Sequence, residues 1–218
     1  MSTTGGSREV EPPQGRRTCY VCFKPHDLCL CGRIRRVENR TRITILQHPR
    51  ERFHAIGTAR IVRLGLSRSE VLIPRGVAPR SLRISLEPPP NSALLFPGTG
   101  ARDLADLDPD ERPAGLIVLD GTWSQARGLY RENPALSRLP RVGLRPLAPT
   151  RYRIRRAPRR DYVSTLEAIV QALGILEPET EGLDGLLAAF DTMIDEQLVF
   201  ANRNPRRPLR KIARLGEG

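Results

Sequence analysis

The chain has 218 residues, of which 39% are hydrophobic, enough for one domain of ordinary size with a single core. Lysine and arginine number 36 against 24 acidic residues, which gives a net charge of +12, and nearly all of the excess is arginine. No run of about 18 apolar residues exists, which excludes a transmembrane helix, and no apolar segment typical of a secretory signal begins the chain. We therefore expect a cytoplasmic protein with reduced thiols, no membrane partner and an affinity for polyanions.

Four regions follow one another along the chain. Residues 1–17 are polar and rich in glycine, proline and charge, and we expect a disordered tail there. A cysteine-bearing module at 18–36 and a main domain at 37–202 come next. Residues 203–218 form a second tail, which is basic.

The main domain alternates apolar runs with helical patterns. The runs predict β-strands at 42–48, 70–73, 92–96 and 115–119, with further candidate strands at 141–147 and 151–156. Helical spacing predicts helices at 51–65, 124–133, 164–176 and 183–202. Ser164 and Glu167 fit a capping box at the start of the third helix. Continuous apolar strands between helices predict an α/β fold with a mostly parallel sheet covered by helices on both faces.

All four cysteines lie within thirteen residues, 19-CYVCFKPHDLCLC-31. Thiolates bind Zn²⁺ tetrahedrally, and two short turns that each present two sulfurs suit one ion, so we expect a structural zinc site. The ligands would be Cys19, Cys22, Cys29 and Cys31. Two disulfides are the alternative, which a reducing compartment disfavours. The module would stabilise the fold, or present Lys24 and Arg33 to a nucleic acid.

Polar residues and glycines follow two of the predicted strands. In open α/β sheets, ligands bind beyond the carboxyl ends of the strands. The segment 120-DGTWSQ-125 occupies that position after the strand 115–119, and 95-LFPGTG-100 occupies it after the strand 92–96. Simpler explanations stay open at this point: Asp120 could cap the next helix, Trp123 could fill the core, and the glycines could form only a turn.

Together these segments resemble the DTW-domain family, the tRNA-uridine aminocarboxypropyltransferases, which are relatives of the SPOUT class of S-adenosylmethionine enzymes. The match covers about residues 18 to 200. Its blocks are the cysteine cluster, QHPRE (47–51), LFPG (95–98), DGTWSQA (120–126) and YVSTLEA (162–168).

The resemblance implies a fold and a reaction. The fold would be SPOUT-like, with a C-terminal knot that forms the cofactor pocket. The enzyme would transfer the 3-amino-3-carboxypropyl group of S-adenosylmethionine to N3 of a tRNA uridine, in the variable loop, giving acp3U and methylthioadenosine. We expect a monomer, because the zinc module would replace the second subunit of dimeric SPOUT enzymes.

The resemblance also implies site residues. Asp120 is the candidate base, because burial would raise its pKa from about 3.9, and Thr122, Trp123 and Gln125 would hold the base or the cofactor. The expected cofactor-binding residues are Leu95, Phe96, Pro97, Gly98, Leu119, Tyr162, Ser164, Thr165 and Glu167. His48 and Glu51 either touch the RNA or brace the loop after the first strand.

An arginine-rich stretch supports an RNA substrate. No acidic residue occurs from Asn133 to Arg160. A strand would place Arg151, Arg153 and Arg155 on one face, and we expect these residues and Arg156 to contact the RNA backbone. A GC-rich genome would also raise the arginine total, but it does not explain where the arginines fall.

Three rival functions remain. A SPOUT-type RNA methyltransferase would use the same cofactor and substrate class but give a different product. A non-catalytic zinc protein that binds RNA would not need Asp120. A DNA-binding regulator is disfavoured, because no helix-turn-helix pair is recognisable.

Overall fold

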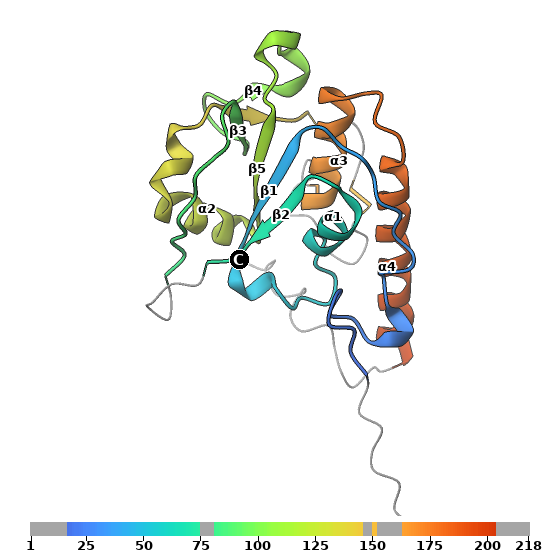
Figure 1. The fold of residues 1–218 in the computed structure, drawn as a ribbon. Coiled ribbons are helices and arrows are strands. Elements are labelled where there is room, and N and C mark those ends of the chain that lie inside the picture. The colour runs from blue at the N-terminus through green and yellow to red at the C-terminus, as the bar shows by residue number, and fades with distance from the viewer. Residues whose placement is uncertain (1–16, 75–80, 146–149, 152–162, 204–218) are drawn as a thin grey trace, which may run out of the picture.

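The computed structural model describes residues 17–74, 81–145, 150–151 and 163–203. In this part of the chain, six parallel strands form one sheet in the order β2-β1-β5-β3-β6-β4 (Figure 1). The strands are β1 Arg42–Gln47, β2 Ser69–Leu72, β3 Ser92–Leu95, β4 Arg102–Asp103, β5 Gly115–Asp120 and β6 Arg141–Gly143. The helices are α1 Ala59–Gly65, α2 Trp123–Glu132, α3 Thr165–Leu176 and α4 Leu183–Arg203. Short 3-10 helices are η1 His26–Leu28, η2 Pro49–Glu51, η3 Leu104–Asp106, η4 Pro109–Glu111 and η5 Pro134–Arg138.

The two central strands are buried on both faces. Every residue of β5 is buried, and in β1 only Arg42 is exposed. Their side chains alternate between two apolar clusters, as successive residues of a strand must. Ile43 and Ile45 of β1 face one cluster, and Leu46 faces the other. The predicted parallel α/β sheet, with its most apolar strand near the centre, is confirmed.

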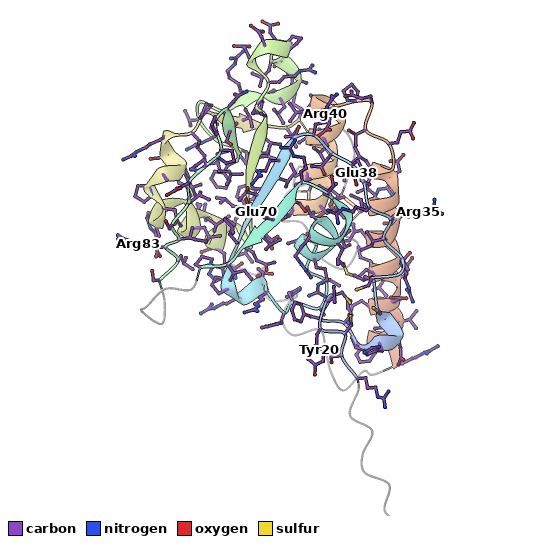
Figure 2. The ribbon with its side chains drawn as sticks, viewed as in Figure 1. Tyr20, Arg35, Glu38, Arg40, Glu70 and Arg83 are labelled. Atoms are coloured by element: carbon purple, nitrogen blue, oxygen red, sulfur yellow. The ribbon has the colours of Figure 1, made fainter. Side chains whose placement is uncertain are left out.

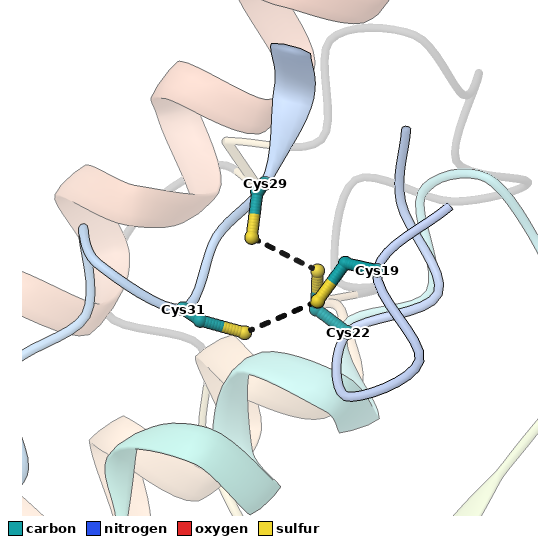
Figure 3. A group of neighbouring side chains, drawn as sticks. All are labelled: Cys19, Cys22, Cys29 and Cys31. Carbon is teal, nitrogen blue, oxygen red and sulfur yellow. Dashed lines mark hydrogen bonds between the residues drawn. The ribbon is translucent and has the colours of Figure 1, made fainter. Parts of the chain in front are cut away.

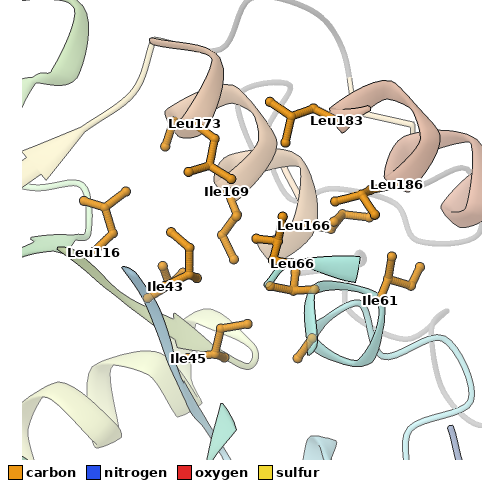
Figure 4. Close-up of a cluster of buried hydrophobic side chains, with 14 of the residues drawn as sticks. Ile43, Ile45, Ile61, Leu66, Leu116, Leu166, Ile169, Leu173, Leu183 and Leu186 are labelled. Carbon is orange, nitrogen blue, oxygen red and sulfur yellow. The ribbon is translucent and has the colours of Figure 1, made fainter. Parts of the chain in front are cut away.

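Helices cover the two faces unequally (Figure 1). The larger cluster joins the sheet to α1, α3 and α4, and Figure 4 shows Ile169 and Leu173 of α3 packed towards Ile43 of β1. On the other face, α2 packs with Leu129 against Ile117 of β5. An extended segment adds Leu82, Ile84 and Leu86 to that second cluster.

The end of α3 is fastened to the start of β1 by a buried carboxylate. Glu177 is 1% exposed and accepts hydrogen bonds from the backbone N–H groups of Arg40, at 2.7 Å, and Thr41, at 3.0 Å. The hydroxyl of Thr180 donates to the same carboxylate at 2.8 Å. Three donors therefore compensate the burial of this charge.

The helix predicted over 51–65 is wrong in its first half. Only Ala59–Gly65 is α-helical, while Pro49–Glu51 forms a 3-10 turn that His48 caps. Gly57, a poor helix former, lies in a turn, and its N–H donates to the carbonyl of His54. Phe53 fits the helical spacing but is 65% exposed.

The remaining expectations meet the structure in different ways. The predicted strand at 141–147 is confirmed for Arg141–Gly143. The strand predicted at 151–156 lies, except for Arg151, outside the described residues, and the described residues do not test the expected knot. The tails lie almost wholly outside them too. No described helix has the length and apolarity needed to span a membrane.

Candidate functional site

Asp120 ends the central strand β5 and is held there by two side chains. It pairs in register with Gln47, the last residue of β1. The Gln47 amide Nε2 donates to Oδ2 of Asp120 at 2.8 Å, and the Thr165 hydroxyl donates to Oδ1 at 2.6 Å. The carboxylate therefore joins β1, β5 and the first residue of α3 at the carboxyl edge of the sheet.

The surroundings of Asp120 favour its protonated form. Burial raises the pKa of Asp120, and the neighbouring charge of Glu51 raises it further. The hydrogen bonds from Thr165 and Gln47 act in the opposite direction, because they stabilise the carboxylate. The net direction of the shift in the pKa of Asp120 is upwards.

Asp120 is not the cap of the helix that follows it. Thr122 is the N-cap of α2, and its hydroxyl accepts from the N–H of Gln125 at 3.3 Å. The Gln125 side chain accepts in return from the N–H of Thr122 at 2.5 Å. Thr122 and Gln125 thus cap α2, and the carboxylate of Asp120 takes no part in this capping.

A cavity of about 280 Å³ opens beside this edge of the sheet. We call it the edge cavity. Six of the expected cofactor-binding residues line it: Leu95, Phe96, Pro97, Leu119, Ser164 and Thr165. Trp123 and Gly121 of the DGTWSQ segment line it as well. The structure thus brings together three segments that are far apart in the sequence.

Sequence reasoning missed part of the cavity wall. Val118, Gly143, Leu144 and Val163 also line it. Val118 precedes Leu119 on β5, and Gly143 and Leu144 lie at the end of the short strand β6. Alternation places Val118 on the face of β5 opposite to the expected Leu119, so it gave no signal for Val118, and the other three depend on tertiary packing.

Aromatic rings form one wall of the edge cavity. The Phe96 ring lies 5.9 Å from that of Trp123 and stacks on that of Tyr130 at 5.8 Å. Arg141 donates to the Tyr130 hydroxyl at 2.6 Å, with its guanidinium carbon 5.0 Å from the Tyr130 ring centre. This stack fixes the Phe96 side chain at the wall of the cavity.

Two expected cofactor-binding residues do not line the edge cavity. Glu167 forms the predicted capping box with Ser164 and also accepts hydrogen bonds from the Thr150 hydroxyl and the Arg151 N–H. Its carboxylate therefore holds residues 150–151 against α3. Gly98 has a φ of 146°, which favours glycine, and forms a turn with Ala101. Tyr162 lies outside the described residues.

His48 and Glu51 brace the loop after β1. The Nδ1 atom of His48 accepts from the Arg50 N–H at 3.2 Å, and its backbone N–H donates to the Asp120 carbonyl at 2.9 Å. Burial lowers the pKa of His48, which favours the neutral ring. Glu51 lines a second hollow, which Gln47 also lines.

The four cysteines converge on one point (Figure 3). Their sulfurs all lie within 4.8 Å of one another, with 3.8 Å between Cys19 and Cys31 and 3.7 Å between Cys22 and Cys29. A tetrahedral ion with metal–sulfur bonds of about 2.3 Å separates its sulfurs by about 3.8 Å. A disulfide needs about 2.05 Å, so the geometry fits a zinc ion and not two disulfides.

The surroundings shift the pKa values of Cys19 and Cys31 in opposite directions. Backbone hydrogen bonds, first of all from Cys22, lower the pKa of Cys19 to about 6. Burial and the neighbouring thiols raise the pKa of Cys31 to about 12. Four thiolates so close together need a cation between them, as a closed zinc site with four cysteine ligands provides.

Of the two basic residues expected to contact a nucleic acid, Lys24 is buried and Arg33 is exposed. Lys24 is only 4% exposed, and burial lowers its pKa to about 8. Arg33 forms an ion pair with Glu196 of α4. The suggestion that the module presents Lys24 to a nucleic acid is therefore wrong, whereas the exposed Arg33 keeps that role as a prediction.

The arginine-rich stretch is less free of acids than its sequence indicates. Arg145 forms ion pairs with Asp103 and Asp106, and Arg151 lies 2.8 Å from Asp191 of α4. The acids come from other parts of the chain. Arg153, Arg155 and Arg156 lie outside the described residues, so their contact with RNA stays a prediction.

A parallel sheet with a small-molecule cavity at its carboxyl edge and a four-cysteine module beside it defines an α/β protein with a ligand site. The DTW domain matches residues 16–198, so the chain belongs to the DTW domain family.

Curated relatives support this membership. The chain is 31% identical to tRNA-uridine aminocarboxypropyltransferase 2 of Drosophila melanogaster over 196 residues, 87% of this chain and 78% of that protein. It is 32% identical to the Mus musculus protein of the same name, over 87% of this chain and 66% of that protein. It is 24% identical to tRNA-uridine aminocarboxypropyltransferase A of Arabidopsis thaliana, over 94% of this chain and 89% of that protein. No solved structure matches the chain.

Proposed function

We propose that this protein is a tRNA-uridine aminocarboxypropyltransferase. It transfers the 3-amino-3-carboxypropyl group of S-adenosylmethionine to N3 of a tRNA uridine, in the variable loop. The observation that carries the proposal is the edge cavity, which the LFPG, DGTWSQ and VST segments build together beside the buried Asp120. The names of the relatives that span most of the chain agree with it.

The reaction needs a base and a fixed donor. Uridine N3 carries a proton at neutral pH, and it attacks only after losing that proton. In our proposal, Asp120 takes the proton through lone pairs that Gln47 and Thr165 leave free, since a carboxylate can accept about four hydrogen bonds. The new N–C bond forms at the methylene next to sulfur. The S–C bond breaks, and its electron pair stays on the sulfur of methylthioadenosine.

The edge cavity suits S-adenosylmethionine in size and in chemistry. Its volume of about 280 Å³ is near the lower end of the range for small-molecule sites. The apolar wall of Leu95, Phe96 and Leu119 would hold the adenine ring. Ser164 and Thr165 place the positive end of the α3 dipole at the cavity, where the methionine carboxylate would bind. Orientation of the donor decides which carbon reacts.

The remaining parts take supporting roles in the proposal. Zinc would be held by Cys19, Cys22, Cys29 and Cys31 and would stabilise the module without taking part in the transfer. Arg151, Arg153, Arg155 and Arg156 would contact the tRNA backbone. The C-terminal part of the chain would form the knot of a SPOUT-like pocket, and the protein would act as a cytoplasmic monomer.

The test is a product analysis. Purified protein is incubated with S-adenosylmethionine and unmodified tRNA, and the digested nucleosides and the small-molecule product are measured by mass spectrometry. We expect acp3U and methylthioadenosine, and a loss of at least about 100-fold in rate for Asp120→Asn, the size of a general-base contribution. Methyluridine with S-adenosylhomocysteine would instead identify a methyltransferase.

A pH series tests the role of Asp120 as the base. A base works only when deprotonated, so the rate should fall as the pH falls through the raised pKa of Asp120. The pH at which the rate has fallen by half should lie above the ordinary aspartate pKa of about 3.9. A rate that is flat down to the ordinary aspartate range would reduce Asp120 to a positioning residue.

A further inference from the structure

Exposed large hydrophobic side chains are concentrated in the cysteine module and the loop after β1. In the described part of the chain, five such residues are exposed, and four of them belong to the module or to the loop after β1. These four are Tyr20, at 89% exposure, Phe53, at 65%, Val21, at 52%, and Phe23, at 37%. Figure 2 shows Tyr20 at the outer edge of the module. Clustered exposed aromatics commonly mark an interaction site.

Phe23 occupies a backbone position that disfavours its side chain. Its φ is 56°, in the left-handed region, and the turn that begins at Cys19 closes with a hydrogen bond from Phe23 N–H to Cys19 O. Glycine would fit that turn without strain, and a bulky residue there is an outlier. Strain of this kind tends to persist where the side chain has a task. The Phe23 ring packs edge-to-face on that of Phe53, with 5.4 Å between centres.

Arginines accompany these rings. The guanidinium carbon of Arg52 lies 4.9 Å from the centre of the Phe53 ring. Arg63 of α1 donates to the carbonyl oxygen of Val21 and so ties the module to the main domain. Rings with stacked guanidinium groups beside them are what proteins use to bind unpaired nucleotides, whose bases stack and whose phosphates are negative.

A groove extends from Phe23 to Gln47, the neighbour of the candidate catalytic residue Asp120. This groove of about 210 Å³ is lined by Phe23, Arg52, Arg63, Glu51 and Gln47, among others. Gln47 is the residue that donates to the carboxylate of Asp120. The groove therefore runs from the module to the side chain that holds Asp120.

We propose that Tyr20, Phe23, Phe53 and Arg52 form a docking surface for unpaired nucleotides of the substrate RNA. This aromatic docking surface rests on the proposed function, since it takes the substrate to be RNA. The bases would stack on the rings, and Arg52 would contact a phosphate. A protein partner fits less well, because the chain carries a net charge of +12 and arginine flanks the rings.

The test measures the dissociation constant of unmodified tRNA by fluorescence anisotropy. For the double variant Tyr20→Ala/Phe53→Leu we expect binding that is at least about tenfold weaker, because each stacked base contributes a factor of about five or more. Phe53→Leu keeps an apolar side chain but removes the ring, whereas Phe53→Tyr keeps the ring and should bind like wild type. Val199→Ala, an exposed hydrophobic residue on α4, is the matched control and should bind like wild type.

Two further variants separate strain and charge from stacking. Phe23→Gly relieves the backbone at that position, so zinc content should be kept while tRNA binding weakens. Arg52→Ala should lower the slope of log Kd against log salt concentration by about one unit.

The outcomes distinguish this inference from the proposed function. If the double variant, with unchanged zinc content and circular dichroism, binds tRNA as tightly as wild type, the docking surface is wrong. The docking surface is also wrong if sedimentation shows that the double variant only disrupts a dimer of this protein. If wild type binds tRNA through these residues but forms no acp3U, the docking surface stands and the proposed reaction fails. With both correct, the KM for tRNA rises in the double variant while turnover at saturating tRNA is kept.

Discussion

The hydroxyl of Thr165 donates a hydrogen bond of 2.6 Å to Asp120, so the first residue of α3 is held against the last residue of β5. Thr165 also lines the edge cavity, whereas Gln47, the second donor to Asp120, lines the groove that Phe23 and Arg52 share. Asp120 thus lies at the junction between the expected donor site and the expected RNA side. Two of our predictions concern this junction.

Thr165→Val should move the acidic limb of the activity profile to higher pH. The Thr165 hydroxyl stabilises the carboxylate and lowers the pKa of Asp120, so its loss raises that pKa further. A base with a higher pKa is deprotonated only at higher pH. Initial rates at saturating S-adenosylmethionine across the pH range measure the shift. Thr165→Ser, which keeps a hydroxyl, is the control, and identical profiles for both variants would show that this bond does not tune the reacting group.

Gly121→Ala should disturb both the start of α2 and the edge cavity. A Cβ at this position would lie 2.9 Å from Cβ of Gln125 and 3.0 Å from its Oε1, so the capping box with Thr122 must shift. Loss of an N-cap interaction costs about 1 kcal/mol. Thermal denaturation and the KM for S-adenosylmethionine measure the two effects.

Gly174→Ala is the matched control for that substitution. It lies inside α3, and a Cβ there meets nothing within 4 Å. Alanine should therefore stabilise the protein by about 0.5–1 kcal/mol through helix propensity. Equal destabilisation by both substitutions would mean that the capping box at Thr122 is not the cause of the Gly121→Ala effect.

Removal of zinc should unfold the cysteine module. We expect one zinc ion per chain by elemental analysis, and Cys22→Ser, which alters a fully buried ligand, should lose it. A chelator should lower the melting temperature and make the four thiols reactive. His26→Ala should keep the metal, because the four sulfurs complete the site without it; zinc loss in that variant would contradict a site made of cysteines alone.

Glu177→Ala should destabilise the fold by about 2–4 kcal/mol. The substitution leaves the N–H groups of Arg40 and Thr41 without their acceptor. Urea denaturation measures the change. Glu179→Ala is the matched control, because Glu179 is exposed and pairs with the exposed Arg40, so its loss should cost less than about 1 kcal/mol. Similar costs for the two variants would show that the buried contacts are replaced by solvent.

The strands could be predicted because a buried strand of a parallel sheet consists of consecutive apolar residues, which are visible in the local sequence. Four apolar runs indicated β1, β2, β3 and β5 to within one residue at each end. The helix over 51–65 failed because Phe53 has helical spacing but packs on Phe23, a residue of another segment. Local periodicity cannot indicate a partner that only the tertiary fold supplies.

The candidate site could be predicted as a set of segments but not as a set of contacts. The clustering of the cysteines is visible in the sequence, and so are the LFPG and DGTWSQ segments at strand ends. The bond between Gln47 and Asp120 depends on the register of β1 against β5. The lowered pKa of Lys24 likewise depends on its burial and on Arg60, which approaches it from α1.

The ion pair between Arg33 and Glu196 joins residues that are 163 positions apart. During synthesis the cysteine module emerges early and α4 emerges late, since chains fold as they leave the ribosome from the N-terminal side. The nascent module can therefore gather its four sulfurs well before the carboxylate that anchors it exists. Metal loading would then precede the ion pair with α4, whereas the contacts of Phe23 with Phe53 and of Val21 with Arg63 need only segments that are translated before α4.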